Sequence, residues 1–205
     1  MTFVKIAKPN DRVGNYMHVV TGGKYYPFDP RPEEVDIVTI AHHLATRGRF
    51  NGATQHPTDE RRIHYSVAEH SVYVAQYVEF ELGRPDLALT ALLHDGAEAY
   101  NGDLIRPLKY SEEFRKPFER VETLNETAVA RRFGIPFPYP PEIKIADNAV
   151  GLAELLTIVP RNDNEEWLTM FGDDVKPAKI DFAMYDPYFA KQFFLREYER
   201  IMQVK

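Results

Sequence analysis

Apolar residues recur along this chain at intervals typical of helices. Over residues 66–82 and 142–158, valine, isoleucine, leucine and alanine return every three or four positions. Such spacing places apolar side chains on one face of a helix, which can then pack against a core. The predicted helices span residues 33–46, 66–82, 86–100, 111–133, 142–158 and 188–203, with a short helix around Trp167.

The pattern changes only near the N-terminus, where a short hairpin is predicted. Met17–Val20 and Tyr25–Phe28 flank the turn residues Gly22 and Gly23, and glycine supplies the positive φ that tight hairpin turns need. Several helices with so little strand predict an all-α fold, a helical bundle with a short N-terminal β-hairpin. We expect a single domain over residues 1–205, with its core at about 33–158 and a C-terminal helical extension at 159–205.

Composition narrows the cellular context. The chain has 205 residues, 44% of them hydrophobic, and this is enough for one compact core. Its net charge of −6 argues against a surface that coats a nucleic acid polymer. The absence of cysteine rules out disulfides, a thiolate nucleophile and Cys-ligated zinc. We find neither a signal-peptide h-region nor a run of about 18 apolar residues, so we expect a soluble cytoplasmic protein that does not bind membranes.

One apolar segment contains polar residues where a core is expected. His94 and Asp95 are adjacent within the predicted helix at 86–100, and Glu98 follows one turn later. Burying such groups is costly unless they are paired or bind a metal, and imidazole with carboxylate suits a borderline divalent cation. In a continuous helix these three residues share one face.

Each polar residue of this kind also has an ordinary explanation. The His-Asp pair would be solvated if Gly96 ended the helix. His70, one turn into its helix, would be a surface or hydrogen-bonded core histidine. Asp147 would be a helix-start carboxylate, and Asp103 would cap a turn.

Four short motifs favour a common site instead, and in chain order they are Ser66-Val67-Ala68-Glu69-His70-Ser71, Leu93-His94-Asp95-Gly96-Ala97-Glu98, Gly102-Asp103-Leu104-Ile105-Arg106-Pro107-Leu108-Lys109 and Lys144-Ile145-Ala146-Asp147. Together the chain resembles the HD-domain phosphohydrolase superfamily, most closely its small branch of bacterial 5′-deoxynucleotidases and phage relatives. The resemblance covers about residues 33–158.

The resemblance implies a metal centre on an all-helical fold. The family order H…HD…D carried onto this chain names four metal ligands, which are His70, His94, Asp95 and Asp147. The implied cofactor is one divalent transition metal, namely Co, Mn, Zn, Fe or Ni, with a second ion such as Mg accompanying the substrate. Such an ion can activate water and stabilise phosphoryl charge without a covalent nucleophile.

The resemblance also implies roles around the metal. Glu98 is expected to be the catalytic base, and Asp103 to assist at the substrate. Arg49 is expected to bind phosphate and Phe50 to border the nucleoside, although a solvated loop arginine remains open. Lys109 is a further phosphate candidate, with a plain surface role as its alternative.

The expected function is therefore metal-dependent hydrolysis of a small nucleotide at its 5′-phosphate ester. A 5′-deoxynucleotidase would release phosphate from a deoxynucleoside monophosphate. A triphosphohydrolase, acting for example on dATP, is the alternative, since both reactions attack phosphorus held at the same ion. A non-catalytic nucleotide-binding module is the remoter alternative. By resemblance we expect a homodimer or higher homo-oligomer.

Overall fold

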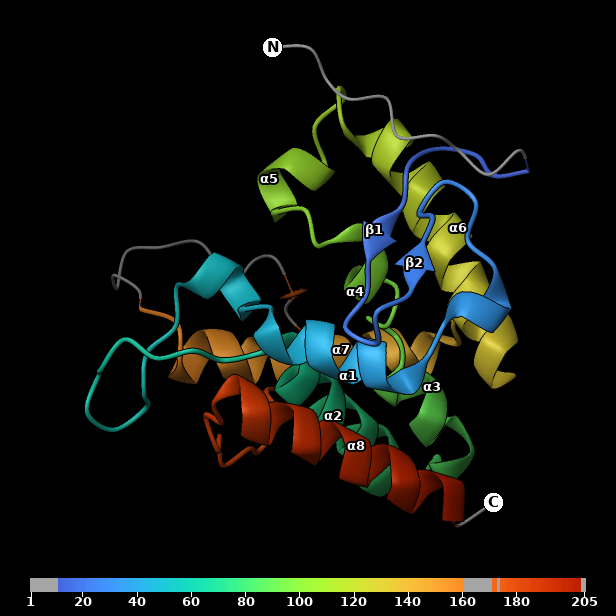
Figure 1. The fold of residues 1–205 in the computed structure, drawn as a ribbon. Helices are drawn as coiled ribbons and strands as arrows, with labels where there is room; N and C mark the ends of the chain where they lie inside the picture. The colour runs from blue at the N-terminus through green and yellow to red at the C-terminus, as the bar shows by residue number, and fades with distance from the viewer. Residues whose placement is uncertain (1–10, 161–170, 173, 204–205) are drawn as a thin grey trace.

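The computed structural model describes residues 11–160, 171, 172 and 174–203. This part of the chain is mostly helical, with one small antiparallel hairpin near its start (Figure 1). The helix predicted around Trp167 lies outside the described residues. The elements are β1 (Met17–His18), β2 (Lys24–Tyr25), α1 (Ile37–Thr46), α2 (Val67–Gln76), α3 (Ala88–Leu92), α4 (Glu98–Asn101), α5 (Arg106–Lys109), α6 (Arg115–Phe133), α7 (Pro141–Thr157) and α8 (Pro187–Gln203).

Helix α2 lies at the centre of the bundle. It packs against α1, α3, α7 and α8, and the C-terminal helix α8 lies alongside α1 (Figure 1). Every residue of α2 from Val67 to Ala75 is buried. Phe194 and Ile201 of α8 belong to the same apolar core as α2. The central helix therefore carries its polar residues into the interior, where they need partners.

Local signals explain where α2 begins. The Ser66 side chain caps the helix by accepting a hydrogen bond from the Glu69 amide at 3.1 Å. The sequence Ser-x-x-Glu resembles a capping box, in which the glutamate would bond back to the serine amide. Glu69 instead accepts from the backbone amides of Met184 and Tyr185, each at 3.0 Å. This carboxylate therefore anchors the segment that leads into α8.

The prediction of a continuous helix over residues 86–100 is wrong. α3 ends at Leu92, residues 93–97 form turns, and α4 begins at Glu98. His94 Nδ1 contacts the Ala91 carbonyl oxygen at 2.7 Å and so occupies an acceptor at the end of α3. A Cβ on Gly96 would lie 2.9 Å from the Leu93 oxygen, so the tight turn requires glycine. His94 and Asp95 therefore lie in the turn between α3 and α4 and not within a helix.

Two other boundaries differ from the prediction. The helix expected from residue 33 starts at Ile37, because Pro32–Glu34 form a separate 3-10 turn and Asp36 caps α1 through the Thr39 amide at 2.8 Å. Within the segment expected to be a loop, Arg106–Lys109 form the short helix α5. The first difference is a shift of about one turn, since helix ends depend on caps more than on periodicity. The second is a single helical turn within the expected loop.

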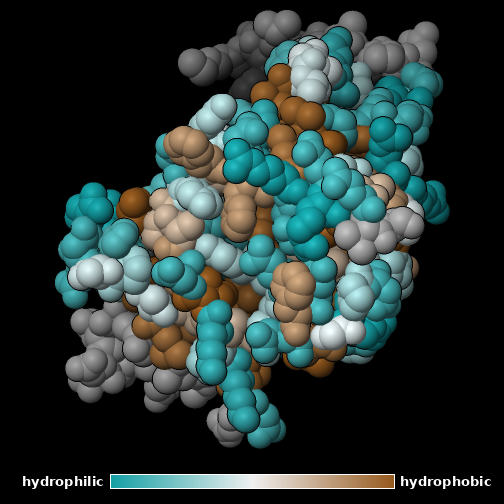
Figure 2. All heavy atoms as spheres, turned by 90° about the horizontal axis from the view of Figure 1, so that it is seen from below, coloured by the Kyte–Doolittle hydropathy of each residue, from teal (hydrophilic) through white to brown (hydrophobic). Residues whose placement is uncertain are grey.

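The hairpin and the surface complete the fold. β1 pairs with β2 around Gly22, whose φ is +83°, and Tyr25 donates to Asn125 of α6 at 2.8 Å. Figure 2 shows hydrophilic side chains over much of one face, with apolar ones in scattered groups. Among the described residues, every helix is too short or too polar to cross a membrane.

Candidate metal centre

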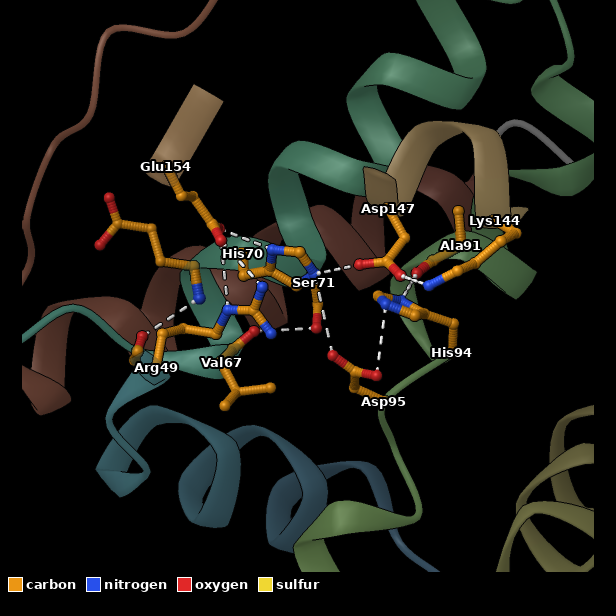
Figure 3. Close-up of polar contacts among 12 residues, drawn as sticks. Arg49, Val67, His70, Ser71, Ala91, His94, Asp95, Lys144, Asp147 and Glu154 are labelled. Atoms are coloured by element: carbon orange, nitrogen blue, oxygen red, sulfur yellow. Dashed lines mark hydrogen bonds and ion pairs between the residues drawn. The ribbon is translucent and has the colours of Figure 1, made fainter. Parts of the chain in front are cut away.

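His70 on α2 is fully buried and points its two ring nitrogens in different directions. Nδ1 lies 2.6 Å from Glu154 Oε1 on α7, and Nε2 lies 3.3 Å from Asp147 Oδ1 of the same helix (Figure 3). A carboxylate can only accept, so Nδ1 carries the hydrogen. In the neutral ring, Nε2 then presents a lone pair.

His94 is oriented in the same way by a different partner. Its Nδ1 faces the Ala91 carbonyl oxygen at 2.7 Å, which again requires the hydrogen on Nδ1. Its Nε2 lies 3.3 Å from Asp95 Oδ1. The other oxygen of Asp95 lies 3.8 Å from His70 Nε2. Asp95 therefore spans the two imidazole rings (Figure 3).

These groups could hold a metal ion. One ligand atom each from His70, His94 and Asp95 lies within 4.8 Å of the others. Ligands bound at about 2.0–2.2 Å in a tetrahedron are separated by about 3.3–3.6 Å, so a small inward movement would complete the coordination. The structure brings three of the four predicted ligands into one cluster.

Asp147, the fourth predicted ligand, lies beside this cluster. Its Oδ1 contacts His70 Nε2, while its Oδ2 accepts from Lys144 at 2.7 Å. The Lys144 side chain is 70% exposed, so this ion pair is easily exchanged for solvent. Asp147 can therefore turn one oxygen to the cluster, and its role as a ligand stays a prediction.

The chemistry of the cluster fits a cation. His70 Nε2 and His94 Nε2 are buried and have no hydrogen-bond partner among the described residues. Facing lone pairs on nitrogen and carboxylate oxygen repel each other unless a proton or a metal ion lies between them. Borderline divalent ions prefer this mixture of imidazole and carboxylate.

The pKa values show how strongly the cluster attracts positive charge. Burial and Arg49 act to lower the pKa of His70, yet Glu154 and Asp147 outweigh them and raise it to about 9. Burial acts to raise the pKa of Asp147, but contact with His70 and the nearby His94 hold it well below its ordinary value. A metal ion would replace the proton of His70, because the bound ring must be neutral.

Glu154 is a site residue that sequence reasoning missed. Its fully buried carboxylate accepts from His70 Nδ1, from the Tyr65 hydroxyl at 2.9 Å and from Arg49 Nη2 at 2.8 Å. Arg49 and His70 lower its pKa to about 2 against the opposing effect of burial. Such a partner fixes the tautomer and orientation of a metal-binding histidine. The available signal was its position on α7, two helical turns after Asp147 and on the same face.

Glu98, the predicted base, lines a cavity of about 270 Å³ together with His94, Asp95 and Asp147. Its Oε2 is buried and unpartnered among the described residues. Burial raises its pKa well above the ordinary value, and the charge of Asp95 adds to the effect. The carboxylate therefore lies beside the cluster, where a bound cation would favour its charged form.

Arg49 contacts Glu154, the residue that engages His70 Nδ1, and Phe50 follows it in the chain. The Arg49 side chain is 20% exposed and paired with Glu154, and its guanidinium carbon lies 5.4 Å from the centre of the Phe50 ring. Phe50 has a left-handed backbone, with φ of 51°. The phosphate role of Arg49 stays a prediction, and the structure gives its guanidinium a partner inside the protein.

The last two predicted residues are Lys109 and Asp103, and one of them lines the cavity. Lys109 lines the cavity, where its Nζ donates to Glu122 at 2.7 Å. Asp103 is exposed and is not part of the lining. The structure thus brings Lys109 towards the cluster and leaves Asp103 at the edge.

Comparison with known proteins finds two similar proteins, both of them uncharacterized. No protein family model matches the chain. It is 36% identical over 138 residues to an uncharacterized protein of Rhodobacter capsulatus, a match covering 65% of this chain and 66% of that protein. It is 31% identical over 126 residues to the uncharacterized protein YfdR of Escherichia coli, covering 61% and 62%. The chain thus matches just under two thirds of each relative's length.

Proposed function

We propose that this protein is a metal-dependent phosphohydrolase that acts on small nucleotides, as a 5′-deoxynucleotidase releasing phosphate from deoxynucleoside monophosphates. The observation that supports it most is the pair of buried imidazoles, His70 and His94, whose Nδ1 atoms are both engaged and whose Nε2 atoms meet at Asp95. Together with the order of the motifs, this favours the HD-type site expected from the resemblance.

The residues around the cluster divide the chemical work. His70, His94 and Asp95, with Asp147 as a fourth ligand, would hold a divalent cation, which would supply Lewis acidity for activating water and stabilising phosphoryl charge. Glu98 accepts a proton from the attacking water at its free Oε2. The oxygen of that water bonds to phosphorus as the bond between phosphorus and the nucleoside 5′-oxygen breaks, and the departing oxygen takes up the proton that Glu98 accepted. Glu154 keeps His70 in its metal-binding tautomer.

The charge of the cavity favours a monophosphate over a triphosphate. Among the described residues, two lysines line the cavity, Lys109 and Lys144, and each is paired with a carboxylate. Three carboxylates that are not assigned as metal ligands also line the cavity, and they are Glu98, Glu122 and Glu126. A triphosphate would bring further negative charge into this field at a Coulombic cost. Triphosphohydrolysis of a dNTP such as dATP is therefore the second candidate.

The test is a substrate panel with product analysis. Protein loaded in turn with Mn, Co, Zn, Fe or Ni is incubated with the four dNMPs and the four dNTPs. We expect inorganic phosphate from the monophosphates, and a loss of about 10²–10⁴-fold in kcat for Glu98→Gln with metal still bound. Glu113→Gln, at an exposed glutamate of the same protein, is the matched control. Release of triphosphate alone would favour the second candidate, and no product with any metal would reject both.

A further inference from the structure

The cavity beside the metal cluster has polar groups on its wall that the proposed hydrolysis does not use. Both amide atoms of Asn101, Nδ2 and Oδ1, are buried without a hydrogen-bond partner among the described residues. The hydroxyl of Tyr139 is also buried without a hydrogen-bond partner among these residues. Both residues line the cavity with Glu98 and Asp95. Burying such groups without partners opposes folding, so their retention in one cavity indicates a ligand.

Two separate elements present these groups. Asn101 is the last residue of α4, three positions after Glu98, so the two side chains lie on the same helical face. Tyr139 lies in the connector before α7, where its ring packs edge-on against Phe137 with centroids 5.2 Å apart. The Phe137 ring restricts the tyrosine ring, and the hydroxyl is therefore placed with little freedom.

The chemistry of this wall matches neutral hydroxyl groups. A carboxamide and a phenol each offer one donor side and one acceptor side, as an alcohol does. Glu122 and Glu126 also line the cavity, and Glu122 neutralises Lys109. A second anionic group would meet these carboxylates, whereas a hydroxyl can donate to them.

We propose that Asn101 and Tyr139 bind the sugar hydroxyl of the substrate, so that the site selects phosphate monoesters of a hydroxylated sugar. This rests on the proposed function, and it assigns the part of the substrate beyond the phosphate. The hydroxyl that a deoxynucleotide always retains is the 3′-hydroxyl. The enzyme should therefore distinguish a dNMP from its 2′,3′-dideoxy counterpart.

The experiment is a double-mutant cycle in which substitutions in the protein are combined with removal of the 3′-hydroxyl from the substrate. Wild type, Tyr139→Phe and Asn101→Leu are assayed with each dNMP and the matching dideoxy monophosphate, and Tyr188→Phe on the exposed face of α8 is the control. Loss of the 3′-hydroxyl should lower kcat/KM of wild type about tenfold or more, as expected for one lost hydrogen bond with an unpaired partner. In Tyr139→Phe or Asn101→Leu this discrimination should fall to about threefold or less, and in Tyr188→Phe it should persist.

A structural role predicts a different result. If Tyr139 and Asn101 only supported the fold, their substitution would lower the thermal midpoint and leave the discrimination intact. We expect Tyr139→Phe to keep the wild-type midpoint, because the Tyr139 hydroxyl has no hydrogen-bond partner among the described residues. If wild type had the same kcat/KM for the dNMP and for its dideoxy counterpart, the proposal would be overturned by the wild-type data alone.

Failure of the proposed function would be recognised separately. If no nucleotide is hydrolysed, the hydrolase proposal is wrong. Calorimetric titration of wild type with the dNMP and its dideoxy counterpart then tests the hydroxyl subsite. Tighter binding of the dNMP, lost in Tyr139→Phe or in Asn101→Leu, supports the hydroxyl subsite. Equal affinity for the two sugars overturns it.

Discussion

Replacing Glu154 by glutamine tests the most buried part of the site. The carboxylate is fully buried, and it accepts from His70, Tyr65 and Arg49. Glutamine keeps the volume but removes the charge, and its NH₂ group would face a donor. Loss of a partner that orients a metal-binding histidine typically costs about 10–100-fold in metal affinity. We expect a loss of this order for Glu154→Gln.

The same substitution should also destabilise the fold. The pKa of Glu154 is about 2, against an ordinary value of 4.5, and this difference corresponds to about 3 kcal/mol of favourable interaction. Leaving a buried cation without its partner costs about 3–5 kcal/mol, and the 20% exposure of Arg49 reduces this figure. We expect a loss of about 2–4 kcal/mol in the free energy of unfolding.

The assay must separate metal affinity from stability. Metal affinity is measured by competition with a chromophoric chelator at a temperature where both proteins are folded, and stability by urea unfolding in EDTA. Glu197→Gln is the matched control, since Glu197 is a buried carboxylate paired with Arg200 on α8. It should lose stability and keep metal affinity. Wild-type metal affinity in Glu154→Gln would refute the orienting role.

Three further predictions address the cluster and its surroundings. A saturating divalent metal should raise the thermal midpoint of wild type by about 5–10 °C, since 100-fold excess over Kd is worth about 2.7 kcal/mol, and His94→Ala should remove this shift; an unchanged shift would exclude His94 as a ligand. Gly96→Ala should cost about 1–3 kcal/mol in urea unfolding, because its Cβ would meet the Leu93 oxygen at 2.9 Å; full stability would show that the turn can relax. Burial and Glu122 raise the pKa of Glu126 to about 7. The folded protein therefore binds this proton more tightly than the unfolded chain does. Below pH 4.5 Glu126 is protonated in both states and its burial carries no charge penalty, whereas stability is lost as the pH rises from 4.5 through 7. In metal-free protein, Glu126→Gln should match wild type at pH 4 and melt several degrees higher at pH 8, and equal midpoints at pH 8 would contradict the burial of its charge.

Much of the local structure follows from short-range patterns. Ser66 caps α2, Gly134 ends α6 in a left-handed conformation with φ of +65°, and the helices at 115–133, 141–157 and 187–203 lie close to their expected positions. Caps, periodicity and glycine act within a few residues, so they can be read without knowing the fold. The His-Asp pair and Glu98 were recognisable for the same reason.

Other features depend on partners that are distant in the sequence. His94 breaks the helix predicted over 86–100 by contacting the Ala91 carbonyl, which periodicity does not reveal. Arg49, predicted to bind phosphate, is paired with Glu154, 105 residues away. Glu69, which follows Ser66 at capping-box spacing, anchors the backbone at Met184. In each case a side chain with several possible partners takes the one that the packing of helices brings near.

The sequence by itself determined the helical class of this protein and which residues carry the candidate chemistry. Only the tertiary structure decided that His70, His94 and Asp95 meet, that Asp147 lies beside them, and that Glu154 holds His70. Helix formation depends on neighbours three or four positions apart. A cluster of ligands depends on how α2, the turn after α3 and α7 pack, and that is set by the shape of a shared core.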